Sequence, residues 1–291
     1  MKTPVRKIAV VCLISYDANL IFKSLPSYYD YADKIILGTE KRRLSNIMQP
    51  IQIPEEFFKK IKKYPKAELI EENFYSHERT PMDNERAIRN GLSALVPDNY
   101  WLVSIDSDEA LANPGCFFHW LKHHADPNKL IMAQWVHLFK QLSSNQFLVV
   151  TQKNRQNIFV EGFPVATTQK ESFTWGRFTK QEMTGSPLVA VHYHCARKED
   201  ELRLKLKSWG HTHEVRSDFM PIWLSANEHN YKSFSDLHPC VHNVWPALAL
   251  KSLSQISLAC RFYVLLYWVK TFLRDRFPFL VRFWGRIRKI P

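Results

Sequence analysis

The sequence predicts an α/β fold with a mostly parallel sheet flanked by helices, and two observations support this. Within the first 110 residues, short apolar runs at 5–15, 34–39, 67–72 and 100–105 are separated by stretches with helical spacing of apolar residues. Strands that alternate with helices form parallel sheets covered by helices. Hydrophobic residues make up 45% of the 291 residues, which is enough to bury a sizeable core.

The expected elements follow in order along the chain. A buried strand at 5–15 precedes a helix at 18–31, a strand at 34–39, a helix near 55–63 and a third strand at 67–72. Pro81 begins a helix of about four turns, because proline is favoured at the first helical position. The next strand, 100–105, runs directly into Asp106.

After residue 110 the alternation becomes looser. Strands are expected at 130–138 and 146–151, a mixed and strand-like region at 158–195, and a charged helix at 198–209. We expect residues 1–240 to form one domain with halves 1–109 and 110–240, and residues 241–291 to form a helical tail.

The composition excludes several classes of protein. The sequence contains no P-loop and no dinucleotide-binding glycine motif. Its five cysteines are scattered singly, which argues against a zinc ribbon or a disulfide framework and favours a reducing cytoplasm. The apolar run that begins the chain is short and reads as a strand, unlike the core of a signal peptide.

An acidic cluster, Asp106, Asp108 and Glu109, follows the strand at 100–105. Ligands of parallel sheets bind beyond the carboxyl ends of the strands. In an extended segment Asp106 and Asp108 would point to the same side, and Mg²⁺ or Mn²⁺ takes one or two carboxylates plus substrate phosphates. The alternative is a solvated turn in which Asp106 or Ser107 caps the next helix.

Two segments carry a resemblance to a known family. Residues 80–111, with Arg89-Asn90-Gly91-Leu92 and Asp106-Ser107-Asp108-Glu109, resemble bacterial family-2-type GT-A glycosyltransferases. Residues 192–214 resemble the H-Y…R…E-L…K…W-x-H segment of a branch of that superfamily. The resemblance covers about residues 5–225 and implies a GT-A fold, with 1–109 binding the nucleotide and 110–240 the acceptor.

The sequence departs from the family at two places. Tyr16-Asp17-Ala18-Asn19 stands where N-E-E is usual, and residues 39–43 replace D-x-x-S-x-D. Both places belong to the segments that recognise base and ribose, so the resemblance does not identify the nucleotide.

The resemblance implies roles for individual residues. Asp17, Arg89, Asp106 and Glu109 would bind the nucleotide sugar, with bracing of the loop as the alternative role of Glu109. Asp106, Asp108 and His192 would hold Mn²⁺ or Mg²⁺.

Three of these residues also have a plainer interpretation. Asp17 could be a helix N-cap, Arg89 could lie on the solvated face of its helix, and His192 could be a core histidine. His194, His211 and His213 lie close to His192 in the sequence, and such a group could bind zinc instead.

Glu161 is the candidate catalytic base, with Glu171 and Asp218 as alternatives. An inverting transferase needs a carboxylate to remove the proton from the acceptor hydroxyl. Glu161 follows an apolar run and precedes Gly162, in the half that would bind the acceptor.

The C-terminal segment is strongly basic. Residues 245–291 carry nine Lys and Arg against one acidic residue, Asp275, which accounts for +8 of the formal charge of +12. The uncharged run 262–269 is far shorter than the ~20 residues of a membrane-spanning helix. We expect residues 247–291 to form an amphipathic helix that lies on an anionic membrane; the alternative is a pair of helices packed on the domain.

Together these features predict a metal-dependent enzyme that transfers a sugar from a nucleotide-sugar donor to a glycan or glycolipid, such as lipopolysaccharide, at the inner face of a membrane. The same carboxylates would also suit a nucleotidyltransferase or phosphohydrolase. A non-catalytic basic module that binds membrane or nucleic acid is a third interpretation. No helix-turn-helix, zinc-finger or RNP signature supports a specific nucleic-acid partner.

Overall fold

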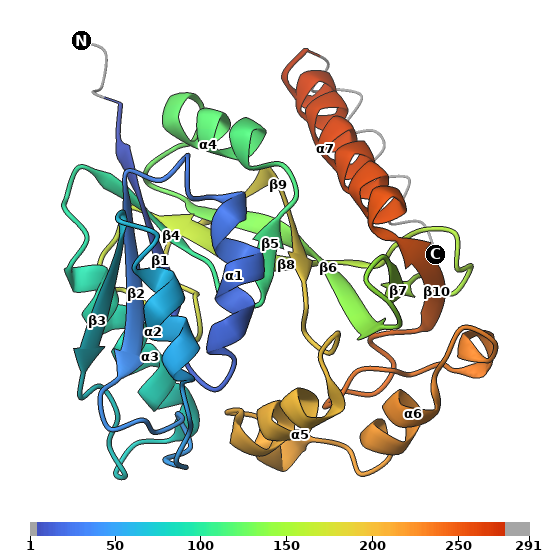
Figure 1. Ribbon diagram of the computed structural model, residues 1–291. Coiled ribbons are helices and arrows are strands. Elements are labelled where there is room, and N and C mark those ends of the chain that lie inside the picture. Colours follow the sequence, from blue (N-terminus) through green and yellow to red (C-terminus); the bar gives the residue numbers. More distant parts are fainter. Residues whose placement is uncertain (1–4, 277–291) are drawn as a thin grey trace.

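Within residues 5–276, which the computed structural model describes, ten strands form one mixed sheet (Figure 1). The first half contributes four parallel strands in the order β3-β2-β1-β4. Their bounds are β1 Lys7–Leu13, β2 Lys34–Glu40, β3 Ala67–Glu72 and β4 Tyr100–Ser104. The apolar runs of the sequence therefore form the strands expected of them.

The second half extends the sheet beyond β4, mainly with antiparallel pairs in the order β8-β6-β7-β10. A further strand, β9, lies parallel to β6 and pairs with the short β5. The bounds are β5 Glu109–Leu111, β6 Leu130–Gln141, β7 Gln146–Thr151, β8 Val160–Thr167, β9 Met183–His192 and β10 Ala247–Ser252.

Helices cover both faces of the sheet, so the predicted α/β fold class is confirmed (Figure 1). The helices are α1 Ile21–Ser24, α2 Glu55–Ile61, α3 Pro81–Ala94, α4 Pro114–His123, α5 Glu199–Ser208, α6 Phe219–Ser225 and α7 Leu253–Arg276. The predicted helix 18–31 is a helical run of three short pieces, Ala18–Leu20, α1 and Leu25–Ser27. Pro26, which has no amide hydrogen to donate, lies in its last piece.

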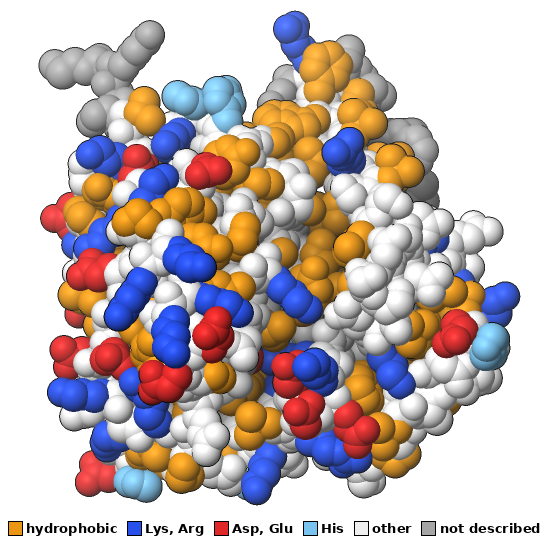
Figure 2. Space-filling model, viewed as in Figure 1, with side chains coloured by type: hydrophobic (Ala, Val, Ile, Leu, Met, Phe, Trp, Pro, Cys, Tyr) orange, Lys and Arg blue, Asp and Glu red, His pale blue; other side chains and the backbone are white. Residues whose placement is uncertain are grey.

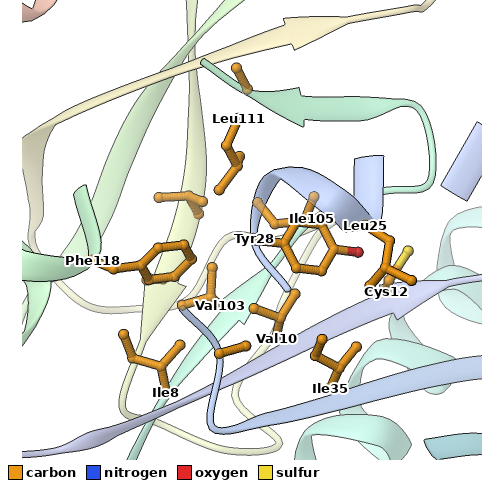
Figure 3. Close-up of a cluster of buried hydrophobic side chains, with 14 of the residues drawn as sticks. Ile8, Val10, Cys12, Leu25, Tyr28, Ile35, Val103, Ile105, Leu111 and Phe118 are labelled. Atoms are coloured by element: carbon orange, nitrogen blue, oxygen red, sulfur yellow. The ribbon is translucent and has the colours of Figure 1, made fainter. Parts of the chain in front are cut away.

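The alternation of side chains along β1 separates two cores. Ile8, Val10 and Cys12 face one side, where they pack with residues of α1, α2 and α4 (Figure 3). Ala9 and Val11 face the other side, which α3 covers with Ile88 and Leu92. Both faces of β1 are buried, which explains its unbroken apolar sequence.

α3 begins as its sequence predicts. Thr80 is its N-cap, with the hydroxyl accepting a hydrogen bond from the amide of Asp83, and Pro81 occupies the first turn. On the buried side of α3, Leu92 packs directly over Gly38 of β2, where an added Cβ would lie 2.1 Å from a Leu92 methyl carbon. The glycine therefore permits the close approach of helix and strand.

The predicted helical tail, 241–291, needs correction. Its residues 247–252 form β10, which pairs with β7 in the sheet, and α7 begins only at Leu253. α7 is not amphipathic: Ile256 and Cys260 are buried against the sheet, while Leu258 and Phe262 on the opposite side are exposed. The rest of the predicted tail, 277–291, lies outside the described residues.

Candidate active site

A pocket of about 420 Å³ lies beyond the carboxyl ends of β1 and β4. Both halves of the predicted catalytic domain line it. The site residues predicted from the sequence that line it are Asp17, Arg89, Asp106, Asp108, Glu161 and His192. Other lining residues with polar or aromatic side chains include Glu85, Trp135, His137, Trp175, Arg177, His194, Lys205, Trp209, His238 and Trp245.

The acidic cluster forms a tight turn. The carbonyl of Asp106 accepts a hydrogen bond from the amide of Glu109 at 3.1 Å, and the Glu109 carboxylate accepts one from the amide of Asp106 at 3.0 Å. The segment is therefore not extended, so the premise that placed Asp106 and Asp108 on one side of a strand is wrong. Both nevertheless line the pocket.

The turn also brings His192 to the cluster. After the turn, β5 pairs with β9 so that Glu109 lies opposite His192, and the amide of Tyr193 donates to the carbonyl of Asp108 at 2.8 Å. His192 Nε2 consequently lies 3.4 Å from Asp108 Oδ1. Two residues 84 positions apart in the chain meet because of one short strand pair.

Two arginines hold Asp106. Arg89 Nη2 lies 3.2 Å from Oδ1, and Arg177 pairs with Oδ2. Arg89 is buried and also binds Ser104 and Glu85, so it does not lie on the solvated face of α3. Burial alone would raise the pKa of Asp106, but Arg177 and Arg89 outweigh it and lower the pKa to about 2.

Glu109 is fully buried and braces the turn from behind. Its Oε1 accepts hydrogen bonds from Arg177 at 2.7 Å and from the indole of Trp135 at 2.9 Å. Burial raises the pKa of Glu109 to about 7, against the opposing charge of Arg177. Glu109 does not line the pocket, so the arrangement favours a bracing role over contact with a sugar.

Asp108, like Asp106, is paired with two cations, and it also faces a histidine. Arg197 and Lys205 both bind its Oδ2, Lys205 at 3.1 Å, and His192 faces Oδ1. Burial would raise the pKa of Asp108, but these three neighbours bring it well below its usual range. The carboxylate is therefore ionised at neutral pH.

Asp17 joins the same network. Its side chain makes no cap hydrogen bond to the helical run that follows, and instead lies 3.2 Å from Arg197. Burial raises the pKa of Asp17, while the charge of Arg197 opposes the shift. Asp17 thus stands at the N-cap position, as the plainer interpretation expected, but its side chain does not cap the helix.

Three buried imidazoles lie together in the lining of the pocket. The rings of His137, His192 and His194 lie with centroids 5.0 to 6.4 Å apart. Burial lowers the pKa of His192 to about 4, despite the nearby Asp108, and brings the pKa of His194 well below its usual value. Both rings are neutral at pH 7 and can accept as well as donate hydrogen bonds.

A divalent cation would find few free ligand positions in this pocket. Within residues 5–276, no three His, Cys, Asp or Glu side chains come together as a metal-binding group. Both oxygens of Asp106 face arginines, so it is poorly placed as a ligand. Asp108 Oδ1 and His192 Nε2, 3.4 Å apart, fit two positions of a cation whose other ligands come from a substrate.

The zinc alternative finds no such support among the described residues. His211 is bound to Glu214 at 3.1 Å, and His213 is exposed. Neither joins His192 and His194 in a ligand group.

Glu161 of β8 is the one of the three base candidates that lines the pocket. His137 Nε2 lies 3.0 Å from its Oε2. Burial would raise the pKa of Glu161, but the hydrogen bond and charge of His137 lower it, so the carboxylate is ionised at neutral pH. Glu171 is exposed in a loop with its amide bound to Ser93, and Asp218 is exposed and paired with Arg216.

Four residues of the site, Arg177, Arg197, Lys205 and His137, were not predicted from the sequence. Arg197 and Lys205 stand at the R and K of the segment 192–214, so that motif contained a usable signal. Arg177 and His137 lie outside the matched motifs, and only the tertiary fold brings them to the turn.

Comparisons with known proteins are weak. No family model and no curated protein matches the sequence. Among solved structures, glycosyltransferase GlyE of Streptococcus pneumoniae TIGR4 aligns over 44% of this chain and 30% of its own, at 20% identity and TM-score 0.29. Its apo form aligns similarly, at 21% identity over 29% of its own chain.

A 4-diphosphocytidyl-2C-methyl-D-erythritol synthase aligns over 57% of this chain and 76% of its own, at 8% identity and TM-score 0.29. This chain spans less than a third of the GlyE chain. A structural similarity this weak does not indicate an activity, and the evidence for function is the geometry of the site.

Proposed function

We propose that this protein is a glycosyltransferase of the GT-A type that uses a nucleotide-sugar donor. One observation carries the proposal: a pocket at the carboxyl ends of parallel strands is lined by an acidic turn, three buried cations (Arg89, Arg177 and Lys205) and a separate, ionised carboxylate. The cations suit a diphosphate, and the separate carboxylate suits the removal of a proton from a hydroxyl.

Residues in different parts of the pocket would have different roles. Asp17 and Arg89 stand on the β1 and α3 side, where the nucleotide part of the donor would lie. Arg177 and Arg89 fix the turn through Asp106, and Glu109 and Trp135 brace it from behind. Because these groups are already held by one another, the site needs little reorganisation when a donor binds.

Glu161 would act as the base. Its carboxylate, oriented by His137, would take the proton of the acceptor hydroxyl as that oxygen attacks the anomeric carbon of the donor. A bound Mn²⁺ or Mg²⁺, held by Asp108 and His192, would supply charge stabilisation for the diphosphate that leaves. The aromatic residues Trp135, Trp209 and Trp245 give the pocket walls on which sugar rings can pack.

Product analysis tests this function. We expect the full-length protein to release nucleoside diphosphate from one member of a panel of nucleotide sugars when an acceptor is present. Glu161→Gln, which keeps the size of the side chain, should slow turnover by about 10² to 10⁴ while donor binding persists. Release of pyrophosphate from a nucleoside triphosphate instead would show a nucleotidyltransferase.

We further propose that α7 attaches the enzyme to a membrane that contains a glycolipid acceptor. One side of the helix presents Leu258, Phe262, Leu265, Val269 and Phe272, all 45 to 69% exposed and spaced three or four residues apart. These five residues define the outer face of α7. Figure 2 shows hydrophobic side chains gathered over this helix.

Lipid is the occupant favoured by charge. The outer face is flanked by exposed Arg261, Lys270 and Arg274, and the segment from residue 245 onward carries +8. Anionic headgroups attract such segments by about 1 kcal/mol per basic residue. The attachment would place the enzyme on the inner face of the membrane.

The helix also corrects an expectation drawn from the short uncharged run 262–269. Among the described residues, Leu253–Arg274 is one helix of 22 residues that is long and apolar enough to cross a membrane, by length and composition alone. Length and composition do not distinguish a spanning helix from one that lies in the interface. The packing of Ile256 and Cys260 against the sheet favours the interfacial arrangement.

A further inference from the structure

A lysine is buried at the edge of the pocket. Lys205 of α5 is 4% exposed, although Arg203 and Lys207 on the same helix are exposed. Its ammonium binds Asp108 Oδ2 at 3.1 Å and His194 Nδ1 at 3.2 Å. A lysine is almost never fully buried unless it is paired. The burial of Lys205 therefore points to a role other than keeping the protein surface soluble.

Every buried cation of the site already has a carboxylate partner without a ligand. Four cations (Arg89, Arg177, Arg197, Lys205) face five acidic residues (Asp17, Glu85, Asp106, Asp108, Glu109). One oxygen of Asp108, Oδ2, is bound by both Arg197 and Lys205. Removing Lys205 from Asp108 would leave that carboxylate still paired with Arg197.

Lys205 is also the cation that can change partners most easily. Arg197 bridges Asp17 and Asp108 and does not line the pocket, and Arg177 bridges Asp106 and Glu109. Lys205 lines the pocket, binds one carboxylate, and carries its charge on a flexible four-carbon stem. Its other partner, a nitrogen of His194, is uncharged at neutral pH.

We propose that Lys205 binds the diphosphate of the donor and stabilises the charge of the leaving nucleoside diphosphate. This inference rests on the proposed function and adds a binding residue to it. In the reaction, the bond between the anomeric carbon and the β-phosphate oxygen breaks, and the electron pair stays on that oxygen. The acceptor oxygen bonds to the anomeric carbon, Glu161 takes the proton, and Lys205 stays protonated and donates a hydrogen bond to the phosphate.

Binding measurements on the full-length protein test the assignment. The probes are UDP, GDP, the corresponding nucleoside monophosphates and inorganic pyrophosphate, titrated by calorimetry with Mn²⁺ present. Lys205→Met should weaken the nucleoside diphosphate and pyrophosphate at least about tenfold, or about 1.4 kcal/mol. The monophosphate should be weakened less, so the preference for diphosphate over monophosphate falls.

Two further variants separate binding from folding. Lys207→Met removes an exposed lysine two positions away on the same helix, and its affinities should match those of the wild type. Lys205→Arg keeps the charge and should retain most of the diphosphate affinity. Thermal unfolding of each variant shows whether the pocket remains folded.

The outcomes distinguish this inference from the function it rests on. Unchanged diphosphate affinity in a folded Lys205→Met overturns the inference while the transferase proposal stands. Binding of pyrophosphate but of no nucleotide, with pyrophosphate lost in Lys205→Met, supports the lysine site and contradicts the proposed donor. If the wild type binds neither nucleotides nor pyrophosphate, both proposals fail.

Discussion

Replacing Arg177 should destabilise the folded protein, because this arginine neutralises the acidic turn. Its guanidinium pairs with Asp106, donates to Glu109 at 2.7 Å and to the carbonyl of Ser104 at 3.2 Å, and its side chain is 6% exposed. Arg177→Met retains an apolar stem of similar reach but removes the charge. Asp106 would keep Arg89, whereas Glu109 would lose its only cation among the described residues.

The magnitude follows from the burial of these partners. Removing one member of a buried ion pair typically costs about 3 to 5 kcal/mol, because the remaining charge is left in an apolar setting. For a chain of this size each kcal/mol lowers Tm by about 2 to 4 °C, so we expect a drop on the order of 10 °C at pH 7.5. Arg203→Met, which removes an exposed pair with Glu199, is the matched control and should change stability by less than about 1 kcal/mol.

The loss should also depend on pH in a defined direction. Burial raises the pKa of Glu109 to about 7, above its unfolded value near 4.3. A raised pKa means that the folded state binds the extra proton more tightly, so this group favours folding below its folded pKa and disfavours it above. Without Arg177 the pKa should rise further, so the variant should recover part of its lost stability as the pH falls from 8 to 6.

Differential scanning fluorimetry of wild type, Arg177→Met and Arg203→Met at pH 6, 7 and 8 measures both effects. A Tm for Arg177→Met that matches the control at pH 8 would refute the claim that this arginine neutralises a buried acidic turn. A deficit that grows as the pH falls would refute the role given to Glu109.

Two other predictions concern the fold and the membrane surface. Gly38→Ala should destabilise the protein by about 1 to 3 kcal/mol in urea unfolding, because its Cβ would overlap the buried Leu92. The control Gly162→Ala, whose Cβ meets nothing closer than 4.0 Å, should not be destabilised, and equal stability of the two variants would contradict the packing described. Replacing Phe262 and Leu265 together by Ser should reduce co-sedimentation with phosphatidylglycerol-containing vesicles at least about fivefold, since both are more than half exposed on the outer face of α7. Leu224→Ser on α6 is the control, and undiminished sedimentation of the double variant would exclude this face as the lipid contact.

Most of the parallel half of the fold was predictable because three of its four strands are buried on both faces. β1, β2 and β4 are nearly continuous apolar segments, and Thr80 with Pro81 marks the beginning of α3. The missed elements lack such signals. β5 has three residues, and α4 begins with a Pro-Gly pair that reads as a loop.

The number of basic residues in the tail did not predict which faces of its helix are polar. Basic residues spread through 247–276 suggested a polar face, but α7 places apolar residues on both its packed and its exposed side. The segment 247–252 alternates too little to be recognised as a strand, and it becomes one because β7 offers an edge to pair with.

The candidate site was predictable where a motif was local. Asp106, Asp108 and Glu109 stand together after a strand, and Arg89 lies in the matched helix. Their long-range partners were not predictable, because the pairing of β5 with β9 and the path of the loop that carries Arg177 decide them. Glu161 was selected by its place in the second half, and its contact with His137 depends on the register of β6 against β8.

The central claim is that this pocket binds the diphosphate of a nucleotide sugar. The most direct measurement is the calorimetric Kd of UDP and GDP, with and without Mn²⁺, for the wild type and for Asp108→Asn. We expect one of the two nucleotides to bind the wild type, Mn²⁺ to tighten it at least about tenfold, and this effect of Mn²⁺ to vanish in Asp108→Asn. Failure of both nucleotides to bind the folded wild type, with or without Mn²⁺, would contradict the account.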